Sequence, residues 1–322
     1  MESVRILAPV MRCVLAAVAM TVAASLWANP VGYSINSRGV DRDDRRVNAL
    51  WRIDLLTGES EYIGWTSFLD VEALALSPDG ALYGADDDTN TLVRVSTVTG
   101  LAQPIGGAGN RYNTGLTPLS RKLDFGMSFT CDGELFVVSD VEQTLFKADL
   151  ESGRLDQVGL SGALGAPITD IAVWGDQVYG IGVGQTADGR SAAPNLYRVD
   201  LGAPSAQLIG PLGAAVAPYN NAGLSFDPDG TLWAVTDRRD VGGRDLPSQI
   251  LRIDPETGLA ELAAESIIGL ESLAVAPPAG CSSRDLLAAA GIPIPVLTPP
   301  GLLIIILSIL GLGAVRLRPG TA

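Results

Sequence analysis

A five-residue pattern occurs five times in the chain and constrains its fold more than any other feature. Each copy has an aliphatic residue, a second hydrophobe, a Lys or Arg, an apolar residue and then, in four copies, Asp. The basic residues of the five copies are Arg52, Arg94, Lys147, Arg198 and Arg252. Their spacing of 42 to 54 positions is typical of architectures built from repeated units, such as propeller blades, solenoids or arrays.

A second pattern precedes four of these copies and predicts a β-hairpin. It consists of an alternating apolar run, a Pro-Asp-Gly-like break and a second apolar run, as in residues 74–83 and 224–233. The break suits a hairpin because Gly supplies the positive φ that a tight turn requires. The basic pattern then forms a third strand, and a Thr-Gly or Ser-Gly turn leads into a fourth. Four strands in a unit of about 40 to 50 residues predict the blade of a β-propeller.

The two ends of the repeat region complement one another. Residues 31–35 match the second strand of the hairpin without a first, whereas residues 271–278 match a first strand without a second. Pairing between them would close the ring and leave no exposed sheet edge. We therefore expect an all-β, five-bladed β-propeller with a split closing blade over residues 29–280, with six blades as the alternative count. Small residues alternate with large ones in the predicted innermost strands, which suits the narrow centre of such a ring.

Composition excludes several classes of function. A net charge of -14 over 322 residues would repel the phosphates of nucleic acid, so we expect no nucleic-acid partner. The sequence contains no histidine, which excludes Ser-His-Asp and Cys-His catalysis and imidazole metal ligands. Carboxylates are the chemistry that remains.

Acidic and amide side chains enter every predicted innermost strand at the same end of the ring. We expect a ligand-binding site at this mouth of the channel, formed by Glu72, Asp124, Asp170, Asn221 and Glu271. Such hard oxygen donors could hold Ca²⁺, and we expect no other cofactor or metal. Alternatively, Glu72, Asp124, Asp170 and Glu271 could serve a glycoside hydrolase as acid and base, although no sequence motif links the chain to one. A hydrated channel entrance without a ligand is the third interpretation.

Several charged segments have simpler interpretations. Residues 86–88 are all Asp but lack the spaced ligands of an EF-hand loop, so a hairpin tip is predicted there. Residues 41–46 and 237–240 mix acids and arginines, which is typical of solvated tips. The basic residues of the repeat could pair with neighbouring Asp side chains within the sheet.

The first 28 residues have the features of a secretory signal peptide. Arg5 and Arg12 precede an apolar run that ends in small residues, and cleavage is expected after Ala28. Two cysteines then remain in an oxidising compartment. Cys131 and Cys281 could form a disulfide, because both follow an innermost strand on one face, or they could remain free thiols, because their blades are not neighbours.

The C-terminal region predicts a stalk and a membrane segment. Residues 281–298 are rich in Pro and Ala, and residues 299–322 contain an apolar run near the lower limit for crossing a bilayer. Arg316 and Arg318 follow this run and would stay cytoplasmic, which leaves the propeller outside.

This tail resembles the IPTL-CTERM protein-sorting domain of Gram-negative bacteria, which is related to the PEP-CTERM group. That family carries Ile-Pro-Thr-Leu-Ser-Glu-Trp-Gly before a short membrane helix and a basic tail. The matching positions here are Ile294, Pro295, Leu297 and Gly301, followed by Arg316 and Arg318. The chain departs from the family at Val296, Thr298, Pro299 and Pro300. The resemblance implies membrane insertion and processing by a sorting peptidase; a plain tail anchor is the alternative.

Taken together, these features predict a binding protein rather than an enzyme. We expect a secreted or cell-envelope β-propeller, similar to other bacterial propeller repeat proteins, that offers its loops to a protein or glycan partner. The alternatives are an extracytoplasmic glycoside hydrolase and a structural disc stabilised by Ca²⁺.

Overall fold

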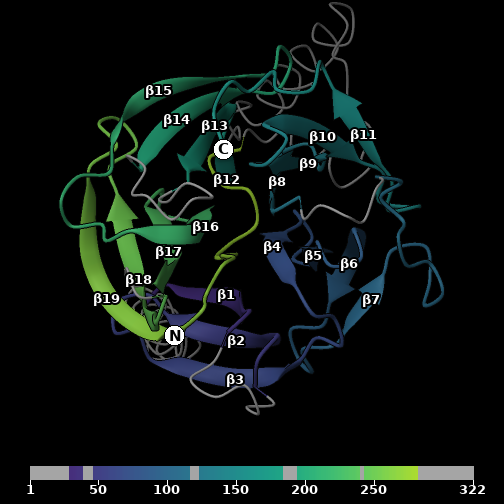
Figure 1. Cartoon of the computed structure of the whole chain (residues 1–322), viewed down its shortest axis with the longest axis horizontal. Helices are drawn as coiled ribbons and strands as arrows, with labels where there is room; N and C mark the ends of the chain where they lie inside the picture. The colour runs from purple at the N-terminus through teal and green to yellow at the C-terminus, as the bar shows by residue number, and fades with distance from the viewer. Residues whose placement is uncertain (1–28, 39–45, 117–122, 184–193, 240–242, 282–322) are drawn as a thin grey trace, which may run out of the picture.

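The computed structural model describes residues 29–38, 46–116, 123–183, 194–239 and 243–281. Within these ranges the chain forms nineteen strands in five antiparallel sheets, which are arranged around a centre like the blades of a propeller (Figure 1). The fold is therefore all-β with five blades, as predicted. The expected signal peptide, most of the stalk, the sorting motif and the C-terminal membrane segment lie outside the described residues, as do residues 39–45. No helix in the described part of the chain is long and apolar enough to cross a membrane.

The strands of each blade follow one another from the centre of the ring to its rim. The first blade holds β1 (Val31–Asn36), β2 (Ala49–Asp54) and β3 (Ser60–Trp65). The second and third blades hold β4 (Val71–Leu76), β5 (Leu82–Asp86), β6 (Thr91–Val95), β7 (Ala102–Pro104), β8 (Phe125–Phe129), β9 (Leu135–Ser139), β10 (Thr144–Ala148) and β11 (Leu155–Val158). The fourth and fifth hold β12 (Ile168–Trp174), β13 (Gln177–Gly182), β14 (Asn195–Asp200), β15 (Ser205–Pro211), β16 (Tyr219–Phe226), β17 (Leu232–Arg239), β18 (Asp245–Ile253) and β19 (Ala260–Ile268).

The first blade is completed by the other end of the repeat region. Tyr33 and Ala274 exchange both backbone hydrogen bonds, at 2.8 and 2.9 Å, and the Glu271 amide donates to the Ile35 carbonyl at 3.3 Å. Residues 270–275 thus take the innermost position that β1 leaves open. This pairing confirms the predicted split blade, which joins the two ends of the propeller body without a free inner edge.

Close contact between neighbouring blades explains the small residues of the innermost strands. A Cβ atom on Gly126 would lie 2.1 Å from the carbonyl oxygen of Thr169 in the next blade. A Cβ atom on Gly223 would lie 2.3 Å from the backbone nitrogen of Leu273. Both separations are much shorter than a van der Waals contact distance, so these two positions near the ring centre accept only glycine.

The Asp that ends the repeated pattern caps the turn after the third strand. Asp149 Oδ1 accepts hydrogen bonds from the amides of Glu151 and Ser152, and Asp200 Oδ1 does the same for Gly202 and Ala203. A short carboxylate that bonds to amides two and three residues ahead stabilises a turn. The repeated Asp therefore stabilises the turn between the third and fourth strands of a blade.

Three of the repeated basic residues lie exposed on the third strands and pair with Glu in adjacent strands or turns, whereas Arg198 is half-buried and donates a hydrogen bond to Gln177 Oε1 at 2.5 Å. Arg52 contacts Glu61 at 3.3 Å, Arg252 contacts Glu261 at 3.0 Å, and Lys147 contacts Glu134 at 2.5 Å. The expectation of Asp partners is wrong for these three, because cross-strand neighbours rather than the Asp of the same pattern face the basic groups.

The chain beyond the closing strand crosses the centre of the ring. We call residues 276–281 the strap; in Figure 1 it is part of the yellow segment that runs from the side of β1 toward β12. Ala279 pairs with Trp174, and its carbonyl accepts a hydrogen bond from the Gly175 amide at 2.8 Å. Pro277 and Pro278 lie against the last residues of the innermost strands and leave a cavity of only about 20 Å³ there. The strap therefore closes one mouth of the channel.

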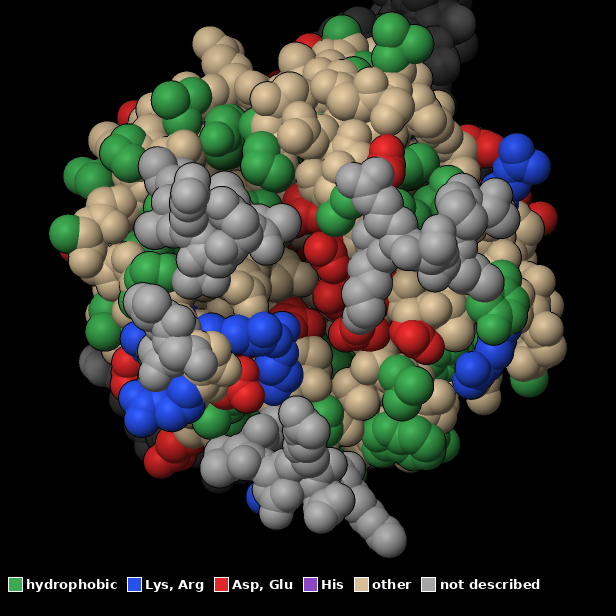
Figure 2. All heavy atoms as spheres, viewed as in Figure 1, with side chains coloured by type: hydrophobic (Ala, Val, Ile, Leu, Met, Phe, Trp, Pro, Cys, Tyr) green, Lys and Arg blue, Asp and Glu red, His purple; other side chains and the backbone are tan. Residues whose placement is uncertain are grey.

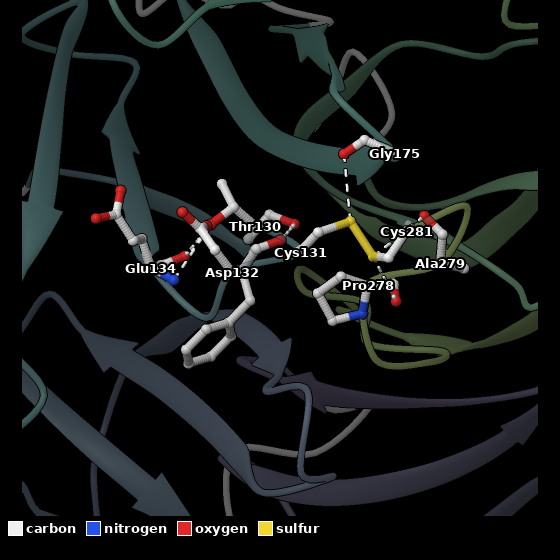
Figure 3. Close-up of a disulfide and its surroundings, with 10 residues drawn as sticks. Thr130, Cys131, Asp132, Glu134, Gly175, Pro278, Ala279 and Cys281 are labelled. Atoms are coloured by element: carbon white, nitrogen blue, oxygen red, sulfur yellow. Dashed lines mark hydrogen bonds between the residues drawn. A yellow bond between two sulfur atoms is a disulfide. The ribbon is translucent and has the colours of Figure 1, made fainter. Parts of the chain in front are cut away.

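A disulfide fixes the end of the strap. Cys131 follows β8 in the third blade and is bonded to Cys281, with 5.5 Å between the two Cα atoms (Figure 3). The objection that their blades are not neighbours fails because the strap carries Cys281 across the ring axis. The alternative of two free thiols is therefore wrong for this structure.

Candidate functional site: the acidic mouth of the channel

Antiparallel pairing brings two sets of residues to the open mouth of the channel. The first residues of each innermost strand lie beside the last residues of the second strand, as in the pairs Val71 with Asp86 and Asn221 with Asp237. Acids at both kinds of position therefore converge. Figure 2 shows acidic side chains gathered at the centre of this face, with a group of basic side chains directly to their lower left.

The open mouth contains a cavity of about 330 Å³. Its described lining consists of Ser37, Arg38, Asn48, Leu69, Asp70, Glu72, Asp124 and Glu271. The structure thus brings together Glu72, Asp124 and Glu271, three of the five residues that the sequence suggested for the site. We call this cavity and the acids around it the acidic mouth.

Two sets of carboxylates in the acidic mouth are close enough to share a ligand. Oxygens of Glu72, Asp87 and Asp124 all lie within 4.8 Å of one another, and so do oxygens of Asp70, Glu72 and Glu271. Glu72 belongs to both sets. It lies in β4, and its side chain is only 8% exposed.

Burial and mutual repulsion disfavour the charged forms of these groups. The pKa of Glu72 is raised well above its ordinary value by burial and then by the charges of Asp124, Asp87 and Glu271. Burial, followed by the charge of Asp124, raises the pKa of Asp87 to about 8. The same two causes raise the pKa of Asp140, which directly follows β9, to about 8. Near neutral pH the acidic mouth therefore holds protons or requires positive charge from elsewhere.

Arg38 supplies positive charge on one side of the acidic mouth. Its guanidinium lies 2.6 Å from Asp237 and 3.7 Å from Glu271, and Glu271 also accepts a hydrogen bond from the Ser37 hydroxyl. Burial and the charge of Asp237 nevertheless raise the pKa of Glu271 to about 8, with Arg38 opposing the shift. Burial raises the pKa of Asp237 to about 6, against the attraction of Arg38.

Asp170 has a different role from the other acids. Its Oδ1 accepts hydrogen bonds from the amides of Met127 at 2.8 Å and Ile171 at 2.9 Å, and its Oδ2 accepts one from Leu224 at 2.6 Å. These amides belong to three successive innermost strands. Burial raises the pKa of Asp170, and the three amides oppose that shift. Asp170 therefore links the third, fourth and fifth blades, and it is not among the residues that line the cavity.

Asn221 also lies outside the cavity lining. It is buried in β16, and its side-chain oxygen accepts a hydrogen bond from the adjacent amide of Ala222 at 2.8 Å. Asp170 and Asn221 are thus the two predicted site residues that do not line the cavity. Their side-chain oxygens instead accept hydrogen bonds from backbone amides of the innermost strands.

Besides Asp70, which immediately precedes β4, three acids of the acidic mouth were not predicted as site residues: Asp87, Asp140 and Asp237. The hairpin tip predicted at residues 86–88 is confirmed, since β5 ends at Asp86 and β6 begins at Thr91. The solvated tip expected at residues 237–240 is wrong for Asp237, which lies within β17. Asp86 and Asp237 are fully buried and Asp87 nearly so, because each lies at the hub end of a second strand. The antiparallel register between the first and second strands was the signal that could have placed them there.

Of the comparisons with known proteins, only that with solved structures finds matches. No family model matches the chain, and no curated protein matches it. One similar solved structure comes from work on the de novo evolutionary emergence of a symmetrical protein; it is 15% identical over 77% of this chain and 99% of its own, with a TM-score of 0.44. Virginiamycin B lyase from Staphylococcus aureus is 13% identical over 72% of this chain and 73% of its own, with a TM-score of 0.37.

A catalytically inactive variant of that lyase with quinupristin is 14% identical over 73% of this chain and 71% of its own, with a TM-score of 0.39. Similarity at this level assigns no activity to the chain. Fold and site together define a five-bladed β-propeller with one strapped mouth and one acidic mouth.

Proposed function

We propose that the protein is a ligand-binding β-propeller whose binding site is the acidic mouth. The observation that carries this proposal is the difference between the two ends of the channel. One end has a cavity of about 330 Å³ lined by carboxylates, whereas the other end is closed by the strap. Concave sites with a few convergent polar groups are where proteins usually bind ligands. A protein or glycan partner would approach the ring from the acidic side.

The geometry supports binding better than glycoside hydrolysis. A retaining hydrolase holds its two carboxyls about 5 to 5.5 Å apart and an inverting one about 6.5 to 9.5 Å apart. Oxygens of Glu72 lie within 4.8 Å of oxygens of Asp124 and of Glu271, a spacing that does not distinguish a hydrolase from a ligand-binding site. The described lining of the cavity includes no aromatic side chain on which a sugar ring could stack. Asp170, one of the four acids of the hydrolase hypothesis, is held by backbone amides.

We also propose that the protein works outside the cytoplasm, at the cell envelope. The signal-peptide features of residues 1–28 and the sorting motif around Ile294 support this location. The Cys131–Cys281 disulfide is consistent with it, because such bonds form and persist in oxidising compartments. Fractionation of cells that produce the chain with and without Arg316 and Arg318 tests the proposed cellular location. Unchanged release of the protein lacking these arginines would contradict the role of the tail.

A glycan array probed with the mature protein tests the binding site. We expect binding that is lost in Glu72→Gln and retained in Glu134→Gln, a matched change at an exposed position paired with Lys147. Equal loss in both variants, or binding that Glu72→Gln leaves intact, would place the site elsewhere. Partners purified from the envelope fraction can be compared with the same pair of variants.

A further inference from the structure

The spacing of the carboxylates in the acidic mouth suits a single metal ion. Two ligands on opposite sides of Ca²⁺, each about 2.3 to 2.6 Å from it, lie roughly 4.6 to 5.2 Å apart, and closer ligands lie at smaller separations. Oxygens of Glu72, Asp87 and Asp124 are all within 4.8 Å of one another, so one ion could contact all three. Mg²⁺ demands near-ideal octahedral geometry, gives up its water reluctantly and is usually held by one or two carboxylates, so a site with three protein carboxylates suits Ca²⁺ better.

A second observation points to a ligand at the same place. Glu72 Oε2 is buried and has no hydrogen-bond donor among the described residues, although Glu72 lines the cavity and is 92% buried. A buried polar atom without a partner is costly, and its presence in a folded protein requires an explanation. A cation in the cavity would provide the missing partner for this oxygen.

The charges around the three carboxylates favour a cation over further hydrogen-bond donors. Asp70 and Glu271 face Glu72 from the neighbouring set, and Asp140 adds its charge near Asp124. Arg38 is engaged with Asp237 and Glu271 on the other side of the acidic mouth. Glu271 therefore already has a positive neighbour and a hydroxyl donor. Glu72, in contrast, keeps a buried oxygen without a donor.

We propose that the acidic mouth binds one divalent cation, with Ca²⁺ preferred to Mg²⁺, through carboxylate oxygens of Glu72, Asp87 and Asp124. The proposal rests on the proposed function in one respect, since the ion shares the cavity with the partner. Water in the cavity completes the six to eight oxygen ligands that Ca²⁺ takes. Asp70 and Glu271 lie near the ion as additional negative charges. The ion would then be the polar group through which hydroxyls of a glycan or carboxylates of a protein are recognised.

Calorimetric titration of CaCl₂ into the chelator-treated mature protein tests this site. We expect one ion per chain, at least tenfold tighter binding of Ca²⁺ than of Mg²⁺, and a rise in Tm with added Ca²⁺. Glu72→Gln should weaken Ca²⁺ binding at least tenfold, and Asp124→Asn provides a second variant should the first fail to fold. The control Glu134→Gln should bind Ca²⁺ within twofold of the unaltered protein.

The metal-free Tm distinguishes a ligand from a merely structural acid. Glu72→Gln replaces a buried carboxyl group whose charged form is disfavoured, so its Tm in chelator should equal or exceed that of the unaltered protein, while its Tm in Ca²⁺ should be lower. No heat and no change in Tm with Ca²⁺, or equal Ca²⁺ binding by Glu72→Gln, would overturn the proposal. Glycan binding that survives chelation would also count against the ion and leave the proposed function intact. Ca²⁺ binding without any partner would support the ion and contradict the proposed function.

Discussion

The two mouths of the channel are made from opposite ends of the same innermost strands, yet they have opposite physical character. The strapped mouth is filled by Pro277 and Pro278 and held by the Cys131–Cys281 disulfide. The acidic mouth is open and concentrates carboxylates whose charged forms are disfavoured by burial. The comparison indicates that the strap and its disulfide stabilise the fold at one mouth. This stabilisation offsets the cost of the buried like charges at the other mouth.

Breaking the strap should have the largest effect. The disulfide closes a loop between residues 150 positions apart, for which the chain-entropy model gives a stabilisation of about 4 to 5 kcal/mol. Replacing both Cys131 and Cys281 with Ser should lower the free energy of unfolding by roughly this amount in urea denaturation. Added reductant should destabilise the unaltered protein and leave the double variant unchanged. A loss below about 1 kcal/mol would show that the strap contributes little.

Removing the carboxylate that links three blades should come next. Asp170→Ala leaves three buried amides, those of Met127, Ile171 and Leu224, without their acceptor. We expect a loss of about 2 to 4 kcal/mol in the free energy of unfolding, with a smaller loss for Asp170→Asn, which keeps one acceptor oxygen. Thermal and urea unfolding would measure both. Equal effects of the two substitutions would argue that bulk rather than hydrogen bonding matters at this position.

The pH dependence of stability should distinguish the acidic mouth from the rest of the chain. The folded-state pKa values of Asp87, Asp140 and Glu271 are about 8, above their ordinary values of 3.8 and 4.5. Their contribution to stability is therefore fully present below about pH 4 and is lost as the pH rises toward 8. The chelator-treated protein should be less stable at pH 8 than at pH 5 by at least about 1 kcal/mol. Greater stability at pH 8 would contradict the burial of these acids.

Changes at the rim of the blades should have the smallest effect. Arg52 and Glu61 are both more than half exposed, and pairs of this kind contribute about 0 to 1 kcal/mol. Arg52→Ala should alter the free energy of unfolding by roughly 0.5 kcal/mol or less and should not change ligand binding at the acidic mouth. A larger loss would indicate that the repeated basic residues contribute more to the free energy of unfolding than exposed ion pairs usually do.

The features that were predictable from the sequence are those that local chemistry determines. Alternating apolar runs and the Gly of the hairpin turns define strands over short stretches, so the repeat predicted five blades. The split blade followed from two matching fragments, residues 31–35 and 271–278, each of which lacked its partner. Convergence of acids such as Glu72 and Glu271 at one mouth followed from their shared position at the start of an innermost strand.

The features that were missed depend on contacts between distant segments. Asp237 lies in a charged run that is typical of an exposed tip, but in the structure it is fully buried beside Arg38 and Glu271, which come from distant parts of the chain. Asp170 lies near the start of an innermost strand, as the acids of the cavity do, but it is one position further along the repeat than Glu72 and Glu271. Only the neighbouring innermost strands determine that backbone amides take both of its oxygens. The disulfide depends on the path of the strap, which no periodicity encodes.

The central claim is that the two mouths differ in function, and a crystal of the mature protein grown with Ca²⁺ would test it most directly. The account predicts a single strong anomalous peak in the acidic mouth, among the side-chain oxygens of Glu72, Asp87 and Asp124. A peak at the strapped mouth, or no ion among these oxygens at saturating Ca²⁺, would contradict it.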